Sequence, residues 1–321
     1  VGLLVANGYG MVIGHTAQVT VTGVAPEFQM LGTGFADSFL CVGRWSADAT
    51  PPFIGAVKSR HATIGSSAIV NNGDGVLDIV GYIDDGADFA SDVARIRFIV
   101  DDASPAENQT GGAILFNTAT VTGSTGVERM RITSAGKVGI GPDAPDSTLH
   151  VQTASAGSVT AVSNYDDLIV ENSTHCAISI WAPDDSQSAL AFGSPSDAGG
   201  AYVTWVHDTN LMTVGTTNTG GILKFISDNG TAAMRIDSSQ NVGIGNDSPH
   251  ATHADFDSIS LGGGGFIQST HTAGASNSIA FAVNAHYDTD GSWEYISGDE
   301  ATLYYMQNGQ HNFQVKGVGT A

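Results

Sequence analysis

Two histidines in the last third of the chain have a spacing that could bind a metal ion. His250 and His253 are separated by two residues, and neutral imidazole nitrogens are common ligands of zinc and other transition metals. Three chains around one axis would bring three copies of each imidazole together. A partly solvated interior histidine is the alternative, because a repeat in the sequence places His253 where its other copy has Leu149. The spacing alone is a weak signal without further ligands, so no metal ligand is predicted.

Two aspartates close to the C-terminus resemble the opening of a calcium-binding loop. Asp288 and Asp290 are followed by Gly291, but the position for the closing bidentate glutamate does not hold one. The Asp-Gly pair lies between two aromatic strand-like segments, which is typical of a hairpin turn. The same interpretation applies to residues 84–88 and to residues 184–185, so we expect turns at all three places and no cofactor.

Groups for hydrolysis are present, but they show no catalytic arrangement. The chain has 32 acidic residues, so carboxylate pairs of the kind that cleave glycosidic bonds are expected by chance. No Gly-x-Ser-x-Gly segment marks a nucleophilic serine. The glycine run Gly262–Gly265 is not followed by a predicted helix, which a phosphate-binding loop requires. We therefore expect no catalytic residues and a protein that is not an enzyme.

Aromatic side chains are the best candidates for contacts with sugars, since a flat ring stacks on the apolar face of a pyranose. Most large aromatic residues of small β-modules fill the core instead. Trp293 and Tyr295 directly follow the turn at Gly291. We therefore predict that these two form an exposed patch for glycan contact.

These candidate residues are positioned by a chain that contains an internal repeat. Residues 130–145 read MRITSAGKVGIGPDAP and residues 234–249 read MRIDSSQNVGIGNDSP, with 10 of 16 positions identical at an offset of 104 (234 − 130). Each copy predicts a short strand, a tight turn and a second short strand interrupted by glycines. Glycine within a strand usually marks a close approach of another group.

The apolar residues of the two copies alternate with these glycines, so they face one common interior. Three such strands around an axis would bury the isoleucines together. The residues predicted to form this shared trimer core are Met130, Ile132, Val138, Ile140, Met234, Ile236, Val242 and Ile244.

The repeat also resembles a known family. Residues 129–151 look like the recurring shaft motif of bacteriophage tail fibres and related trimeric fibre proteins. Residues 73–82 and 88–97 look like the module that precedes this motif in such fibres, and the resemblance covers most of residues 56–256. It implies an elongated, all-β homotrimeric fibre, in which β-knobs are joined by intertwined β-prism or β-helix necks.

The same resemblance implies a structural role on a virion. The expected function is attachment to the host cell surface as a tail fibre, with the chain itself, other tail or virion proteins and a host glycan or protein as partners. The protein would be made in the host cytoplasm. A polysaccharide-depolymerising tailspike is one alternative, although such spikes usually have an uninterrupted coil of similar rungs. A head fibre, a decoration protein or a cellular adhesin is another.

Composition agrees with a β-rich chain and excludes some partners. The 321 residues include 41 glycines and only 13% charged residues, which is typical of many short strands and turns. A net charge of −21 opposes binding to nucleic acid. No run of 18 apolar residues indicates membrane insertion. Cys41 and Cys176 are far apart in the sequence, so no disulfide framework is expected.

The repeat divides the chain into predicted modules. Residues 1–55 form an N-terminal β-unit, in which short apolar runs such as Phe39–Val42 predict strands. Two modules that each end in a shaft motif occupy residues 56–151 and 152–255. Residues 256–321 begin a third, which we expect to be incomplete, because the next motif would fall near residue 338 (234 + 104). Val1 is not a start methionine, so a longer natural chain is expected.

Overall fold

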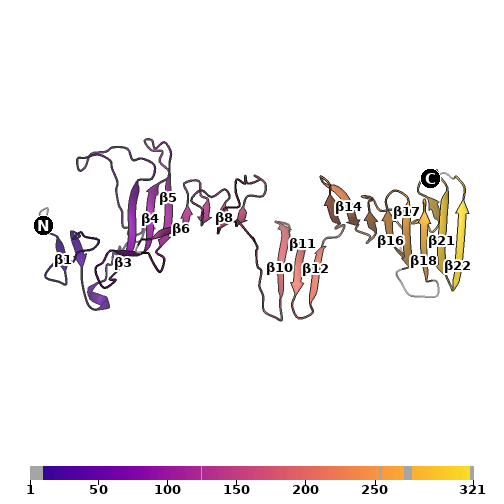
Figure 1. The fold of residues 1–321 in the computed structure, drawn as a ribbon, viewed down its shortest axis with the longest axis horizontal. Coiled ribbons are helices and arrows are strands. Elements are labelled where there is room, and N and C mark those ends of the chain that lie inside the picture. The colour runs from indigo at the N-terminus through magenta and orange to yellow at the C-terminus, as the bar shows by residue number, and fades with distance from the viewer. Residues whose placement is uncertain (1–9, 124, 254, 271–276, 319–321) are drawn as a thin grey trace. The chain divides into compact units, whose positions relative to one another are not determined.

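The protein is nearly all-β, as the glycine-rich and helix-poor sequence predicts. The computed structural model describes residues 10–123, 125–253, 255–270 and 277–318, shown as a ribbon in Figure 1. Among these residues the one helical element is a three-residue 3-10 helix, η1 (Phe35–Asp37). No helix in the described part of the chain is long and apolar enough to cross a membrane.

The chain divides into two compact units, Val1–Ile178 and Ser179–Ala321. The first unit begins with β1 (Met11–Ile13) and β2 (Phe28–Met30), which pair in parallel. The predicted strand at residues 39–42 is wrong, because these residues lie outside every strand and their side chains are exposed. Residues 1–9 of the predicted N-terminal β-unit lie outside the described residues.

A seven-stranded sheet dominates the first unit, with its strands in sequential order. The pairs from β3 to β7 are antiparallel, whereas β7–β8 and β8–β9 are parallel. The strands are β3 (Gly75–Ile83), β4 (Ser91–Val100), β5 (Gly112–Thr118), β6 (Val127–Ile132), β7 (Val138–Ile140), β8 (Leu149–Gln152) and β9 (Leu168–Glu171).

The repeated motif folds as the sequence predicts. β6 and β7 form an antiparallel hairpin, and the turn between them uses Gly136 at φ +79°. Glycine adopts this left-handed conformation without the steric cost that a side chain would add. β8 then pairs with β7, so the sheet continues past residue 151 to β9. The division of the chain into four modules stays a prediction.

The second unit contains a three-stranded sheet, an eight-stranded sheet and a two-stranded hairpin. The larger sheet has the order β13-β14-β15-β16-β17-β18-β21-β22, so it continues past residue 255. The strands of this unit are β10 (Gln187–Ser194), β11 (Asp197–Val206), β12 (Leu211–Thr216), β13 (Leu223–Ser227), β14 (Thr231–Ile236), β15 (Val242–Ile244), β16 (Phe256–Leu261), β17 (Gly265–Thr270), β18 (Ser278–Val283), β19 (Ala285–Tyr287), β20 (Trp293–Tyr295), β21 (Ala301–Gln307) and β22 (Gln310–Lys316).

One face of the eight-stranded sheet is covered by the chain itself. A cluster of buried apolar residues lies on this face, and the hairpin β19–β20 contributes to it. Its buried members are Phe266, Ala280, Ala282, Ala285, Ala301 and Leu303. Phe266 retains only 2% of its exposure, so this cluster is a true core that a single chain forms alone.

The second copy of the motif pairs as the first does, up to its last strand. In the first copy Ile140 lies opposite Val151, and in the second copy Ile244 lies opposite Leu261. Equivalent positions in the strands that follow the two motifs are therefore 110 residues apart in the sequence (261 − 151). The motifs themselves are 104 residues apart, so the difference is six residues. The expectation that His253 replaces Leu149 is wrong, since Ile259 takes that place in the register. Three of the additional residues lengthen the loop before β16, and the other three extend the start of β16.

Candidate assembly face

Strand pairing gathers apolar side chains on one face of the seven-stranded sheet. Residues directly opposite one another on paired strands share a face, and every second residue of a strand returns to it. Met130 lies opposite both Phe116 and Ile140. The residues of this first apolar face are Leu77 and Ile79, Ile96 and Phe98, Ile114 and Phe116, Met130 and Ile132, Val138 and Ile140, Leu149 and Val151, and Leu168 and Val170.

All of these side chains are apolar, yet none is buried in the single chain. Ile79 is 57% exposed, Ile140 42% and Leu168 51%. Contiguous apolar patches of this kind are rare on monomeric soluble proteins and usually mark an interaction surface. The face spans all seven strands, with Ile79, Ile140 and Leu168 exposed and its other members partly buried, so it is a candidate interface.

The opposite face of the same sheet is covered locally. A Cβ atom on Gly139 would lie 2.6 Å from the carbonyl oxygen of Pro142 and 3.5 Å from Pro145, because the loop after β7 folds back over this glycine. Both prolines are buried, as are Ala113 and Leu115 of β5. The glycines of the motif thus admit the chain's own backbone, while the isoleucines remain uncovered on the other side.

The eight-stranded sheet carries a second apolar face, opposite its buried core. Phe281, Tyr304 and Phe313 stack across three strands of it, with ring centroids 6.2 and 4.5 Å apart. Phe313 is 78% exposed. The residues of this second apolar face are Leu223 and Phe225, Met234 and Ile236, Val242 and Ile244, Ile259 and Leu261, Ile267, Ile279, Phe281 and Val283, Tyr304 and Met306, and Phe313 and Val315.

The eight residues predicted from the repeat as a shared core all lie on these two faces. The sheet register places Met130 and Ile132 beside Ile140 and Val138, and it places their counterparts in the second copy in the same way. Their common orientation is therefore a property of the fold. Their role in a trimer core stays a prediction.

The exposed area of the chain is larger than that expected of a compact monomer of its length. The chain exposes 22,015 Å², whereas a folded monomer of this size is expected to expose about 12,500 Å². Residues 32–69, all of which are exposed and lie outside the sheets, contribute to this excess together with the two apolar faces. Hydrophobic burial is the main favourable term in folding, so uncovered sheets of this kind are poorly stabilised alone.

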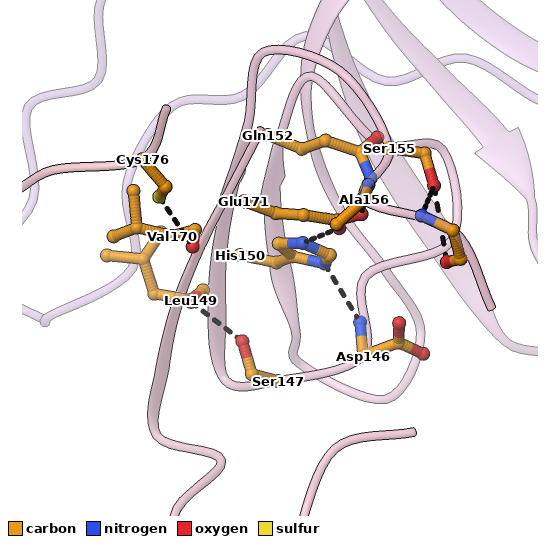
Figure 2. A network of polar contacts seen from close by, with 11 residues as sticks. Asp146, Ser147, Leu149, His150, Gln152, Ser155, Ala156, Val170, Glu171 and Cys176 are labelled. Atoms are coloured by element: carbon orange, nitrogen blue, oxygen red, sulfur yellow. Dashed lines mark hydrogen bonds and ion pairs between the residues drawn. The ribbon is translucent and has the colours of Figure 1, made fainter. Parts of the chain in front are cut away.

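A buried polar cluster follows the first motif and was not predicted from the sequence. His150 is 1% exposed, and its Nε2 lies 2.9 Å from Glu171 Oε2 (Figure 2). The backbone N–H of Asp146 donates to His150 Nδ1, which leaves Nε2 as the protonated nitrogen that donates to the carboxylate. The only signal in the sequence is alternation, since His150 lies between Leu149 and Val151 and so must face away from the apolar side.

Glu171 accepts several hydrogen bonds in this cluster. The N–H of Ala156 and the amide of Gln152 donate to its carboxylate at 2.5 and 2.6 Å. These two donors, followed by His150, hold the pKa of Glu171 below its ordinary value, since they favour the charged form. The cluster fastens β9 to β8 at the end of the sheet (Figure 2).

Ion pairs occupy the polar face at the other end of the same sheet. Asp78 of β3 accepts two hydrogen bonds from Arg97 of β4, both at 2.8 Å, and Arg95 also reaches it. Arg97 first, and Arg95 to a lesser degree, lower the pKa of Asp78. These contacts make one face of the strand pair polar and leave the apolar face as its opposite.

The acidic segment at Asp288 forms a turn, as the sequence predicts. Asp288 N–H donates to Ser292 O, and Gly291 has φ +86° in the loop between β19 and β20. Carboxylate oxygens of Asp288, Asp290 and Glu294 lie within 4.8 Å of one another. Exposed acidic groups often approach this closely in a hairpin, and the backbone N–H groups of Asp290 and Ser292 already point at Asp288.

The residues predicted to form a glycan patch are half-buried. Trp293 and Tyr295 of β20 pack against the buried cluster of the eight-stranded sheet. The Tyr295 hydroxyl donates to Gly317 O at 2.7 Å, and the Lys316 ammonium lies 5.9 Å from the centre of its ring. Their role in glycan contact stays a prediction.

The two histidines considered for a metal pack against different aromatic rings. His250 stacks on His286, with ring centroids 5.0 Å apart, whereas His253 packs edge-on against Phe256 and Tyr287. Burial lowers the pKa of both His250 and His286. Both imidazoles of the stack are therefore kept neutral.

Comparison with known proteins finds similarity among solved structures, including two of a phage tail fibre. No protein-family model and no curated protein matches the chain. A solved structure of the carboxy-terminal domain of the bacteriophage T5 L-shaped tail fibre matches with 12% identity and a TM-score of 0.33, covering 88% of this chain and 91% of that one. The same T5 domain with its intramolecular chaperone domain matches with 12% identity and a TM-score of 0.33, covering 80% of this chain and 62% of that one.

Proposed function

We propose that the chain is a structural fibre protein of a phage virion and attaches the particle to the host cell surface. The observation that carries the structural part is the pair of uncovered apolar faces, of which the first spans seven strands. A second copy of the chain is the natural occupant, because it brings an identical apolar face of the same length and register.

We base the proposed number of copies, three, and the proposed place on the virion on the resemblance of the shaft motif to that of phage fibres. Its two copies, at residues 130–145 and 234–249, resemble the motif of trimeric phage fibres. Three copies around one axis bring the apolar faces together and leave the polar faces outward. Rigidity, length and several weak contacts per trimer then supply attachment, since linked sites bind more strongly together than alone.

Labelling of intact particles tests the attachment role. Gold-labelled antibody raised against the purified chain should decorate the tail region of phage particles in electron micrographs, and the same antibody should reduce adsorption to host cells. Labelling of the head, or of uninfected cells, would contradict a tail-fibre role and support a decoration protein or an adhesin.

A further inference from the structure

The loop that follows the second copy of the motif is longer than the loop that follows the first. The motifs are 104 residues apart, but the strands that follow them, represented by Val151 and Leu261, are 110 apart. Three of the six additional residues lengthen the segment between the motif and β16, and the other three extend the start of β16 itself. Additional residues in one copy of a repeat are accommodated in loops, and such loops often form the binding surface of repeat proteins.

The extended loop forms one wall of a pocket of about 560 Å³. This volume lies within the range of small-molecule sites. The pocket is lined chiefly by Gln240, Asn241, Thr252, His253, Phe256 and Asp257. Phe256 precedes the buried Ser258 by two residues in β16, so its ring lies on the side of the sheet that carries the buried core. The pocket therefore stays accessible when another chain covers the second apolar face.

The pocket wall is held rigid by an internal hydrogen-bond network. Asn241 is 2% exposed, and its Oδ1 accepts from Ser258 Oγ at 2.7 Å and Thr252 Oγ1 at 3.2 Å. Its Nδ2 donates to Asp237 Oδ2 at 3.3 Å. His253 lies edge-on to Phe256, with ring centroids 6.3 Å apart. A wall fixed in this way is preorganised for a ligand.

Gln240 has an unfavourable backbone conformation at the rim of this pocket. Its φ is +68°, and the equivalent residue of the first copy is Gly136, at φ +79°. A side chain in this region is strained, whereas glycine is not, and such strain concentrates at functional sites. The side-chain amide of Gln240 makes no hydrogen bond to any residue that the structure describes. The second copy thus retains a free amide at a position where glycine would fit better.

The lining chemistry points to an uncharged, hydroxyl-rich ligand. Amide, hydroxyl and carboxylate groups surround the ring of Phe256, and neither lysine nor arginine is among the described lining residues. The net charge of −21 also repels anions. We propose that this pocket binds a neutral saccharide, with one sugar ring against Phe256 and its hydroxyl groups bonded to the side-chain amide of Gln240. This inference rests on the proposed attachment function and names the site that would contact a host glycan.

Binding by the full chain tests the inference. The protein is applied to an array of neutral hexose and N-acetylhexosamine oligosaccharides together with sialylated and sulfated glycans, and the strongest neutral oligosaccharide is titrated by calorimetry. Gln240→Gly should weaken binding at least tenfold without lowering the melting temperature, since it removes the amide and relieves the strain. Phe256→Leu should weaken binding to a similar extent.

The first copy supplies a matched control. Gly136→Gln should lower the melting temperature, because it places a side chain at φ +79°, and should leave saccharide affinity unchanged. Unchanged affinity of Gln240→Gly, binding confined to charged glycans, or no neutral binding at all would overturn the proposal. The native mass of the same samples distinguishes failure of the saccharide proposal from failure of the trimer proposal. Trimers that bind no neutral saccharide would contradict only the saccharide site. Monomers that bind a neutral saccharide would contradict only the trimeric assembly.

Discussion

At the scale of single residues, neighbouring positions of a motif strand have different roles because their side chains lie on opposite faces of the sheet. Ile140 and Ile244 occupy equivalent positions in the repeat and are 42% and 46% exposed. Gly139 and Gly243, one residue earlier, are buried beneath the chain's own loops. The isoleucines are therefore available for the proposed contact between chains, and the glycines allow a contact within one chain.

A charge on the apolar face should prevent assembly. Ile140→Asp would place a carboxylate where another chain is expected to cover it, and burying an unpaired charge costs about 3 kcal/mol or more. We expect the native mass, measured by sedimentation, to fall from trimer toward monomer.

The matched control is Val121→Asp, in a turn where Val121 is fully exposed. It introduces the same charge outside both apolar faces and should leave the mass unchanged. Equal masses for the wild type and Ile140→Asp would show that the first apolar face is not an interface.

The buried cluster at His150 predicts a pH-dependent contribution to stability. The pKa of Glu171 is lowered in the folded chain, so its contribution is present above the unfolded value and is lost as pH falls through the folded value. Glu171→Gln should lower the melting temperature at pH 7, and the difference from wild type should shrink steadily below about pH 4. A difference that is equally large at pH 3 would mean that the charge of Glu171 contributes nothing.

At the scale of elements, the hairpin β6–β7 is shaped by what each of its faces must contact. A Cβ on Gly139 would lie 2.6 Å from Pro142 O, and one on Gly243 would lie 2.2 Å from Asn246 O. Both neighbouring atoms belong to backbone, which cannot rotate away as the end of a side chain can. The loop after the motif therefore packs against the strand only if these positions are glycine.

Substitution of a motif glycine should weaken the fold directly. Gly139→Ala forces the loop at Pro142 away from β7, and overpacking of this kind costs about 1–3 kcal/mol. Gly75→Ala is the control, because a Cβ there meets nothing within 4 Å. Urea denaturation should show a lower midpoint for Gly139→Ala and an unchanged or higher one for Gly75→Ala. Equal midpoints for the two variants would contradict the close approach.

The sequence predicts the motif hairpins and their apolar face because both depend on local alternation and turn glycines. It does not predict the loop before β16, since the identity between the copies ends at Pro249 and the register is set by the later pairing of Ile244 with Leu261. Phe39–Val42 is apolar enough for a strand, yet pairing depends on distant partners. The burial of Trp293 likewise depends on a core built from four other strands.

At the scale of the whole molecule, the uncovered apolar faces predict that folding and assembly are one process. The chain forms one compact apolar cluster by itself, around Phe266, and leaves both apolar faces uncovered. Anything that binds the folded state alone stabilises it by mass action, including a second copy of the same chain.

Stability should therefore increase with protein concentration. Each tenfold rise should add about 1.4 kcal/mol for every further copy in the assembly, which is about 2.7 kcal/mol for a trimer. Thermal melts recorded by circular dichroism over a hundredfold concentration range would show the midpoint rising. A midpoint independent of concentration over this range would argue for a chain that folds alone.

The most direct test of the central claim is the native molar mass of the purified chain by light scattering, recorded together with the β-signal during stepwise denaturation. A fibre with a shared apolar interface should have a mass of three chains at neutral pH, falling to one chain in the same denaturant range in which the β-signal disappears. A folded monomer that retains its full β-signal would contradict the shared apolar interface.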